Sequence, residues 1–138
     1  MLEEHVRKAE RRIEHDRIVE ALNNLPTHSK MVLLSVYLLS KQKMPHLITG
    51  DIYNVYCEIC EEFGITPLTQ RRVSGLINEL DVIGLLNSQV VSLGRYGRTK
   101  RIHLGISRTV IKNVFSNDER YQSLITYSPK YLRSSFKK

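Results

Sequence analysis

The 138-residue sequence predicts a mainly α-helical fold that carries one small β-hairpin. Apolar residues recur at the spacing of about 3.6 residues that is typical of amphipathic helices. Two short stretches, 86–93 and 98–104, then flank a tip bounded by Gly94 and Gly97. Glycine reaches positive φ at little cost, so these two residues permit a tight reversal of the chain. Helices followed by a basic hairpin are the outline of a winged helix-turn-helix, here with an additional N-terminal helix and a C-terminal helical extension.

The first two helices are expected over 3–24 and 28–41. The first has a loose apolar stripe among mixed charges and no clear N-cap, which suggests a domain that belongs to a longer protein. The segment 23–26 ends it, and Thr27 is expected to cap the second helix. The second helix is apolar nearly all round, so it should form the buried centre of the core.

The third helix is expected over 50–63, with Thr49 as its cap and Asp51 in its first turn, where the helix dipole favours an anion. It contains a C-x-x-C motif, Cys57 and Cys60. A zinc site usually needs about four ligands, and the sequence has no second cysteine pair. We therefore interpret both cysteines as structural and expect no metal site.

The fourth helix is expected over 70–82, after a short turn that contains Pro67 and with Thr69 as its cap. At about 100° per residue its apolar positions cluster on one side. Arg71, Gly75 and Asn78 point away from that side, with Ser74 beside them. Arginine pairs with guanine edges and asparagine with adenine edges, so this face is typical of a helix that reads DNA. The alternative is that the same side chains form an ordinary solvated surface.

The hairpin, residues 86–104, carries basic residues at and after its tip. Arg95 is expected to enter a minor groove or to contact phosphate, and Arg98 and Lys100 to hold the DNA backbone. Tyr96 is expected to pack on sugar or donate to phosphate, with packing on the hairpin itself as the alternative. A short helix over 108–115, a possible helix near 119–127 and a mobile basic tail from residue 129 complete the chain.

The net charge of +7 lies in the second half of the chain. Residues 66–101 carry six basic and two acidic side chains, and residues 102–138 carry seven and two. This asymmetry favours a polyanionic partner, with a merely solubilising surface as the alternative. No stretch approaches the roughly 20 apolar residues that span a bilayer, and the N-terminus is too charged for a signal peptide, so we expect no membrane partner and a cytoplasmic, nucleoid-associated protein. The five histidines are scattered and no catalytic set is recognisable, so an enzyme is not expected.

Three motifs resemble one known family. They are Thr49-Gly50-Asp51-Ile52-Tyr53, Pro67-Leu68-Thr69-Gln70-Arg71-Arg72-Val73-Ser74 and Gly94-Arg95-Tyr96-Gly97-Arg98-Thr99. Over roughly residues 20–105 the sequence resembles the C-terminal winged-helix domain of the archaeal Orc/Cdc replication initiators. The resemblance implies that a recognition helix enters the major groove of origin DNA and that the hairpin, as its wing, reaches the minor groove. It assigns Thr69, Gln70, Arg71, Arg72 and Ser74 to the recognition helix and Arg95, Tyr96 and Arg98 to the wing.

The resemblance also implies a division into residues 1–24, the end of a preceding lid-like region, residues 25–106, the winged helix, and residues 107–138, a helical extension with a basic tail. The family's ATPase module binds ATP or ADP and Mg through a G-x-x-x-x-G-K-[ST] loop, and this sequence contains no such loop. No cofactor is therefore expected in this chain.

The resulting hypothesis is sequence-preferring binding of double-stranded origin DNA. One alternative is a winged-helix transcription regulator, which would need a dimerisation helix or an effector pocket. Another is a protein-docking module for a replicative helicase or for other initiator subunits.

Overall fold

The computed structural model describes residues 2–42, 47–92, 94 and 97–130, with the backbone alone for residues 2–5, 98 and 99. The described chain is mainly helical and has one two-stranded antiparallel sheet, which confirms the predicted fold class. In chain order the elements are α1 (Leu2–Asn23), α2 (Thr27–Ser40), α3 (Thr49–Glu62), α4 (Gln70–Val82), β1 (Leu86–Ser92), β2 (Arg98–Leu104), α5 (Arg108–Ser116) and α6 (Gln122–Ile125).

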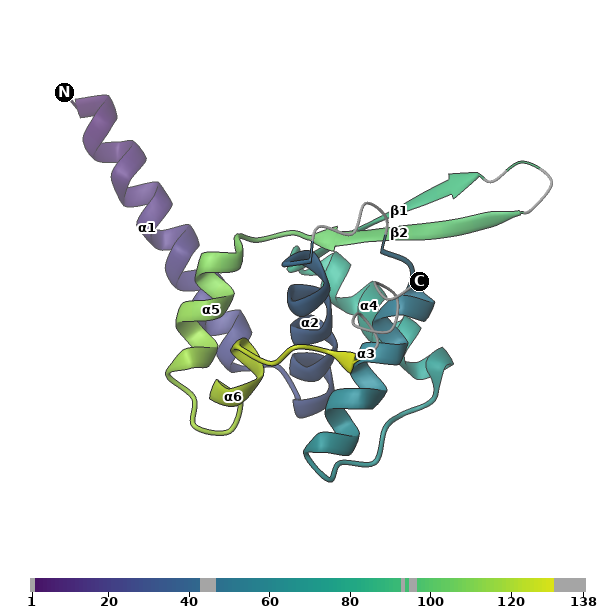
Figure 1. Cartoon of the computed structure of the whole chain (residues 1–138). Coiled ribbons are helices and arrows are strands. Elements are labelled where there is room, and N and C mark those ends of the chain that lie inside the picture. Colours follow the sequence, from purple (N-terminus) through teal and green to yellow (C-terminus); the bar gives the residue numbers. More distant parts are fainter. Residues whose placement is uncertain (1, 43–46, 93, 95–96, 131–138) are drawn as a thin grey trace.

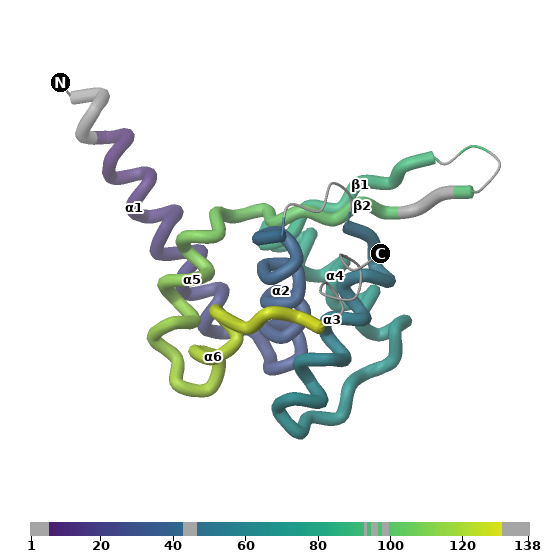
Figure 2. Tube along the Cα trace, viewed as in Figure 1, coloured from purple at the N-terminus to yellow at the C-terminus, as the bar shows by residue number. Residues whose placement is uncertain are grey.

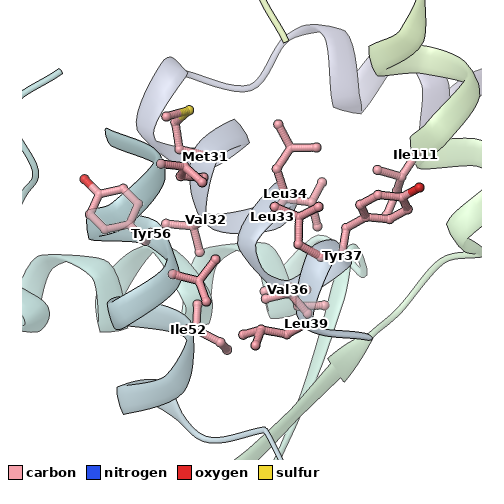
Figure 3. Close-up of a cluster of buried hydrophobic side chains, with 14 of the residues drawn as sticks. Met31, Val32, Leu33, Leu34, Val36, Tyr37, Leu39, Ile52, Tyr56 and Ile111 are labelled. Atoms are coloured by element: carbon pink, nitrogen blue, oxygen red, sulfur yellow. The ribbon is translucent and has the colours of Figure 1, made fainter. Parts of the chain in front are cut away.

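Helix α2 is the centre of the core, as its apolar composition predicts. All nine residues from Met31 to Leu39 are buried. In Figure 3 its side chains lie between Tyr56 of α3 on one side and Ile111 of α5 on the other. Ser35, buried within this run, donates its hydroxyl to the Met31 carbonyl at 2.8 Å, so its polar group has a partner despite the apolar surroundings.

Two of the three predicted helix caps are wrong. Thr27 is the first residue of α2, and Pro26 occupies the N-cap position with φ −61° and ψ 159°. Thr49 likewise lies inside α3, after Ile48, whose backbone N–H donates to the Asp51 carboxylate at 3.3 Å. An N-cap residue needs an extended backbone, and Pro26 and Ile48 adopt it one residue before each threonine.

The cap predicted for the fourth helix is confirmed. The Thr69 hydroxyl accepts a hydrogen bond from the Arg72 backbone N–H at 3.3 Å. This satisfies one of the N–H groups that the first turn of a helix leaves without an intrahelical partner. The helix also keeps the predicted bounds of 70–82.

The C-terminal extension packs on the same core as the rest of the chain. Helix α5 runs one residue further than predicted, whereas the possible helix near 119–127 is only the single turn of α6. Phe115 and Tyr121 meet edge to face with ring centroids 5.7 Å apart, and both are buried. Pro129 is buried and the Lys130 N–H donates to Glu58 at 2.9 Å, so the tail expected to be mobile begins with ordered residues.

Among the described side chains of helix α1, those that pack on the body lie in its C-terminal turns. Leu22 is fully buried there, while Val6 and Ile13 are 54% and 62% exposed. The helix projects away from the body on the side opposite the two strands of the hairpin (Figure 1). Within the described ranges, no helix combines the length and the apolar content that a membrane crossing requires.

The hairpin extends beyond the helical body (Figure 2). Strands β1 and β2 pair in an antiparallel register that sets Leu86 opposite Leu104 and Ser92 opposite Arg98. The Ile102 N–H donates to the Leu47 carbonyl at 2.8 Å. This hydrogen bond links the base of the hairpin to the segment before α3. Gly94 and Gly97 have φ values of +65° and +91°, as the predicted reversal requires.

Candidate nucleic-acid interface

The outward face of α4 has the composition that its helical spacing predicts. Val73, Ile77 and Leu80 are buried against the body. Ser74 is half-buried at the edge of the outward face, and a Cβ added at Gly75 would meet nothing within 4 Å. The exposed residues on the outward face and its flanks are Gln70, Arg71, Arg72, Gly75, Asn78 and Glu79. This face is therefore polar, largely free of internal contacts and open to close approach at its centre.

Two side-chain hydrogen bonds join α4 to the hairpin. The Lys100 Nζ donates to the Asn78 Oδ1 at 2.9 Å, and the Ser88 hydroxyl donates to the Asp81 carboxylate at 2.7 Å. The β1–β2 register places Ser88 opposite Ile102 and Val90 opposite Lys100, so both contacts come from the same face of the sheet. The structure thus brings together two residues, Asn78 and Lys100, that the sequence placed on separate elements.

The contact with Lys100 sets the orientation of the Asn78 amide. Lysine carries only hydrogen-bond donors, so the atom of Asn78 that faces it must be the carbonyl oxygen. The amide nitrogen, with two donor hydrogens, then faces away from the lysine. Asn78 consequently presents donors to any partner that approaches α4 beside the hairpin.

The other predicted wing residues are placed only in part. Arg95 and Tyr96 lie outside the described residues. Arg98 is the first residue of β2 and pairs with Ser92, but only its backbone is described. Within the described part of the chain, Arg71, Arg72 and Lys100 form no ion pair with a carboxylate, so their charges remain available to an anionic partner.

The turn before α4 is held by two tyrosines that were not among the predicted site residues. The Tyr53 hydroxyl donates to the Leu68 carbonyl at 2.9 Å, and the Leu68 N–H donates to the Tyr56 hydroxyl at 2.9 Å. The Tyr56 hydroxyl also lies 2.7 Å from the His28 Nδ1. Burial raises the pKa of Tyr56 to about 12, so this hydroxyl is neutral at physiological pH. The partners in the turn are backbone groups, which leave no signature in the sequence.

The two cysteines lie on α3, away from the outward face of α4. Both are free thiols, Cys60 buried and Cys57 half-buried. Burial raises the pKa of Cys60 to about 11, which keeps its thiol protonated and unreactive near neutral pH. Among the described residues, no group of three or more histidine, cysteine or carboxylate side chains is arranged to hold a metal ion.

Comparisons with known proteins agree with this architecture. Residues 20–114 match the family model described as the Cdc6 C-terminal winged-helix domain. The ORC1-type DNA replication proteins of Thermococcus onnurineus and Pyrococcus furiosus are 46% and 48% identical to this chain over 126 and 128 residues. These matches cover 91% and 93% of the chain but 30% of each relative, so the chain spans less than a third of their length.

A solved structure has the same fold at a similar level of identity. The Aeropyrum pernix ORC1 protein, in complex with DNA, superposes with a TM-score of 0.79 at 41% identity, over 88% of this chain and 31% of that one. The chain therefore belongs to the Cdc6 C-terminal winged-helix family, and it matches about 30% of the length of archaeal ORC1-type DNA replication proteins.

Proposed function

We propose that this domain binds double-stranded DNA at a replication origin and prefers particular sequences there. The observation that carries the proposal is the outward face of α4, which Asn78 and Lys100 connect to the basic hairpin. A similar chain, the Aeropyrum pernix ORC1 protein, was solved in complex with DNA, which supports the same partner for this one. In the proposed complex α4 lies in the major groove, and the wing follows the backbone to the neighbouring minor groove.

Four residues on or beside the outward face of α4 have roles that follow from their chemistry. Arg71 is proposed to make the bidentate contact with a guanine edge. Ser74 and Gly75 allow the helix to approach closely, since the first is small and the second has no side chain. Asn78, oriented by Lys100, donates to an acceptor such as a purine N7 or a phosphate oxygen.

The remaining proposed residues contact the backbone of the DNA. Thr69, Gln70 and Arg72 lie at the start of α4, where the helix dipole and the free N–H groups favour a phosphate. The Thr69 hydroxyl accepts from the Arg72 N–H and keeps its own hydrogen for donation. On the wing, Arg95, Tyr96 and Arg98 are proposed to contact phosphate, sugar or the minor groove.

The proposed wing contacts predict a change in salt dependence. Replacing Arg95 and Arg98 together with alanine should weaken binding to every duplex. It should also reduce the magnitude of the negative slope of log K against log salt by about 1.8, because each phosphate that is no longer neutralised removes about 0.9. Fluorescence anisotropy with a labelled duplex at several salt concentrations measures both quantities.

The matched control is the double replacement of Arg11 and Arg12 by alanine on α1. Both side chains are exposed, and α1 projects on the side opposite the strands of the hairpin, so net charge falls equally without loss of a proposed contact. An unchanged slope in the wing variant would contradict the role of the wing. A flat salt profile for the unaltered domain would instead favour the alternative, a docking module for a replicative helicase or another initiator subunit.

The contact between Asn78 and Lys100 predicts coupled effects on DNA affinity. If Lys100 orients the Asn78 amide, replacing either residue with alanine should also remove part of what the other contributes to the free energy of DNA binding. The double variant should therefore lose less binding free energy than the sum of the two single losses. A double-mutant cycle should give a coupling of about 0.5–1 kcal/mol. Asn87 and His103, an exposed cross-strand pair on the opposite face of the hairpin, provide a control cycle that should be additive. Additivity at Asn78 and Lys100 would show that the two act independently.

A further inference from the structure

The first turn of α4 has one buried side chain, at its end, and its earlier residues depend on the chain that precedes them. Thr69, Gln70, Arg71 and Arg72 are all exposed, and the first buried residue of the helix is Val73. The central and C-terminal turns have Ile77 and Leu80 in the core, whereas the turn that carries Arg71 reaches the core only at its last residue, Val73. The residues before Val73 are therefore restrained from two ends, by Val73 in the core and by the chain that enters the helix.

Leu68 is the residue immediately before the Thr69 N-cap, and both polar groups of its backbone are bound by α3. Its carbonyl accepts from the Tyr53 hydroxyl at 2.9 Å, and its N–H donates to the Tyr56 hydroxyl at 2.9 Å. The two tyrosines lie one helical turn apart, with ring centroids 6.0 Å from each other. They hold this residue from two directions, so its backbone has little freedom to rotate.

The Tyr56 hydroxyl is itself fixed. Its ring is fully buried, and its oxygen lies 2.7 Å from the Nδ1 of His28, near the start of α2. Because the hydroxyl accepts from Leu68, its single hydrogen is available to His28 when Nδ1 is an acceptor. One phenol thus links α2, α3 and the entry to α4.

We propose that Tyr53 and Tyr56 are positioning residues for DNA recognition: their hydroxyl groups hold Leu68, and thereby set the place of the α4 first turn and of Arg71. This inference rests on the proposed function. A bidentate contact with a base edge needs its side chain held within about 0.5 Å of the productive geometry. Long basic side chains that contact phosphates adapt to a small shift. Loss of the two hydroxyls should therefore reduce discrimination between sequences more than general affinity.

The test replaces Tyr53 and Tyr56 with phenylalanine, singly and together. Phenylalanine keeps the rings and removes only the hydroxyls, so the core retains its volume. Affinity is measured for the preferred origin duplex and for a random-sequence duplex, at a temperature at which circular dichroism shows every variant to be folded. The double variant should bind the preferred duplex about 10-fold more weakly, as partial loss of a base contact implies. It should bind the random duplex with unchanged affinity and unchanged salt slope, and its Leu68 amide should exchange hydrogen faster.

Two controls separate positioning from stability. Tyr127→Phe makes the same chemical change on a tyrosine whose hydroxyl donates to Glu58 of α3 at 2.7 Å, and it should leave discrimination unchanged. Phe115→Leu loosens the packing between α5 and Tyr121, away from α4, and should lower stability without changing discrimination. Loss of discrimination in either control would assign the effect to stability and overturn the inference.

The outcomes distinguish this inference from the proposed function. If the unaltered domain does not discriminate between the two duplexes, both fail. If it discriminates, and Arg71→Ala abolishes discrimination while the double tyrosine variant retains it, only the positioning role is overturned. An equal loss of affinity for both duplexes in the tyrosine variant would also overturn it, because a displaced Arg71 should affect the preferred sequence selectively.

Discussion

Replacing Arg71 with alanine is expected to lower affinity for the preferred duplex by about 10- to 100-fold and affinity for random DNA much less. Arg71 is exposed on the outward face of α4 and forms no ion pair within the described part of the chain. A bidentate contact between arginine and guanine contributes about 1–3 kcal/mol of discrimination against the wrong base. Parallel titrations of the two duplexes at one salt concentration give the ratio directly.

Arg72→Ala is the matched control for this prediction. It removes the same charge from the neighbouring position of the same turn, on the flank of the helix rather than on its outward face. We expect it to weaken both duplexes by similar factors, as loss of a phosphate contact does. Equal losses on both duplexes for Arg71→Ala would reduce Arg71 to a phosphate contact as well.

Replacing Leu34 with alanine is expected to lower the free energy of unfolding by about 2–5 kcal/mol. Leu34 is fully buried at the middle of α2, and the side chains of this helix lie between Tyr56 of α3 and Ile111 of α5 (Figure 3). Removing its three outer carbons leaves a cavity in a closely packed core, which the neighbouring side chains cannot easily close. Urea unfolding followed by circular dichroism measures the change.

Ile13→Ala is the control for the core substitution. It removes a side chain of similar size from α1, where 62% of Ile13 is exposed, and should change stability by less than about 0.5 kcal/mol. If the two substitutions cost the same, α2 would not be the centre of packing that its burial indicates.

The fold was predictable wherever one local pattern decided the outcome. The spacing of Val73, Ile77 and Leu80 correctly identified the buried side of α4, and hence its outward face. The cap at Thr69 was also correct, whereas those at Thr27 and Thr49 were wrong, although all three positions hold the same residue type. What differs is the residue that occupies the N-cap with an extended backbone, which is Thr69 itself in α4 but Pro26 and Ile48, one residue before the threonine, in α2 and α3.

The candidate site was predictable as a set of residues but not as a set of contacts. The approach of Lys100 to Asn78 depends on the register of a hairpin that lies 22 residues further along the chain. The hydrogen bond from the Tyr53 hydroxyl to Leu68 uses a backbone carbonyl. Every residue has one, so the residue type at position 68 does not predict this contact. Arg95 and Tyr96 lie outside the described residues, and their roles stay predictions.

The hairpin register also determines where the wing tolerates a change of length. Lys100 and Ile102 share the face that turns toward α4, because side chains alternate with a period of two along a strand. A single residue inserted between them would put the lysine and the buried isoleucine on opposite faces of the hairpin. The hydrogen bond between Lys100 and Asn78 would then be lost. Extra residues between Ser92 and Arg98 would leave the pairing of β1 with β2 unaltered. The length and charge of the tip can therefore change while the hydrogen bond between Lys100 and Asn78 is kept.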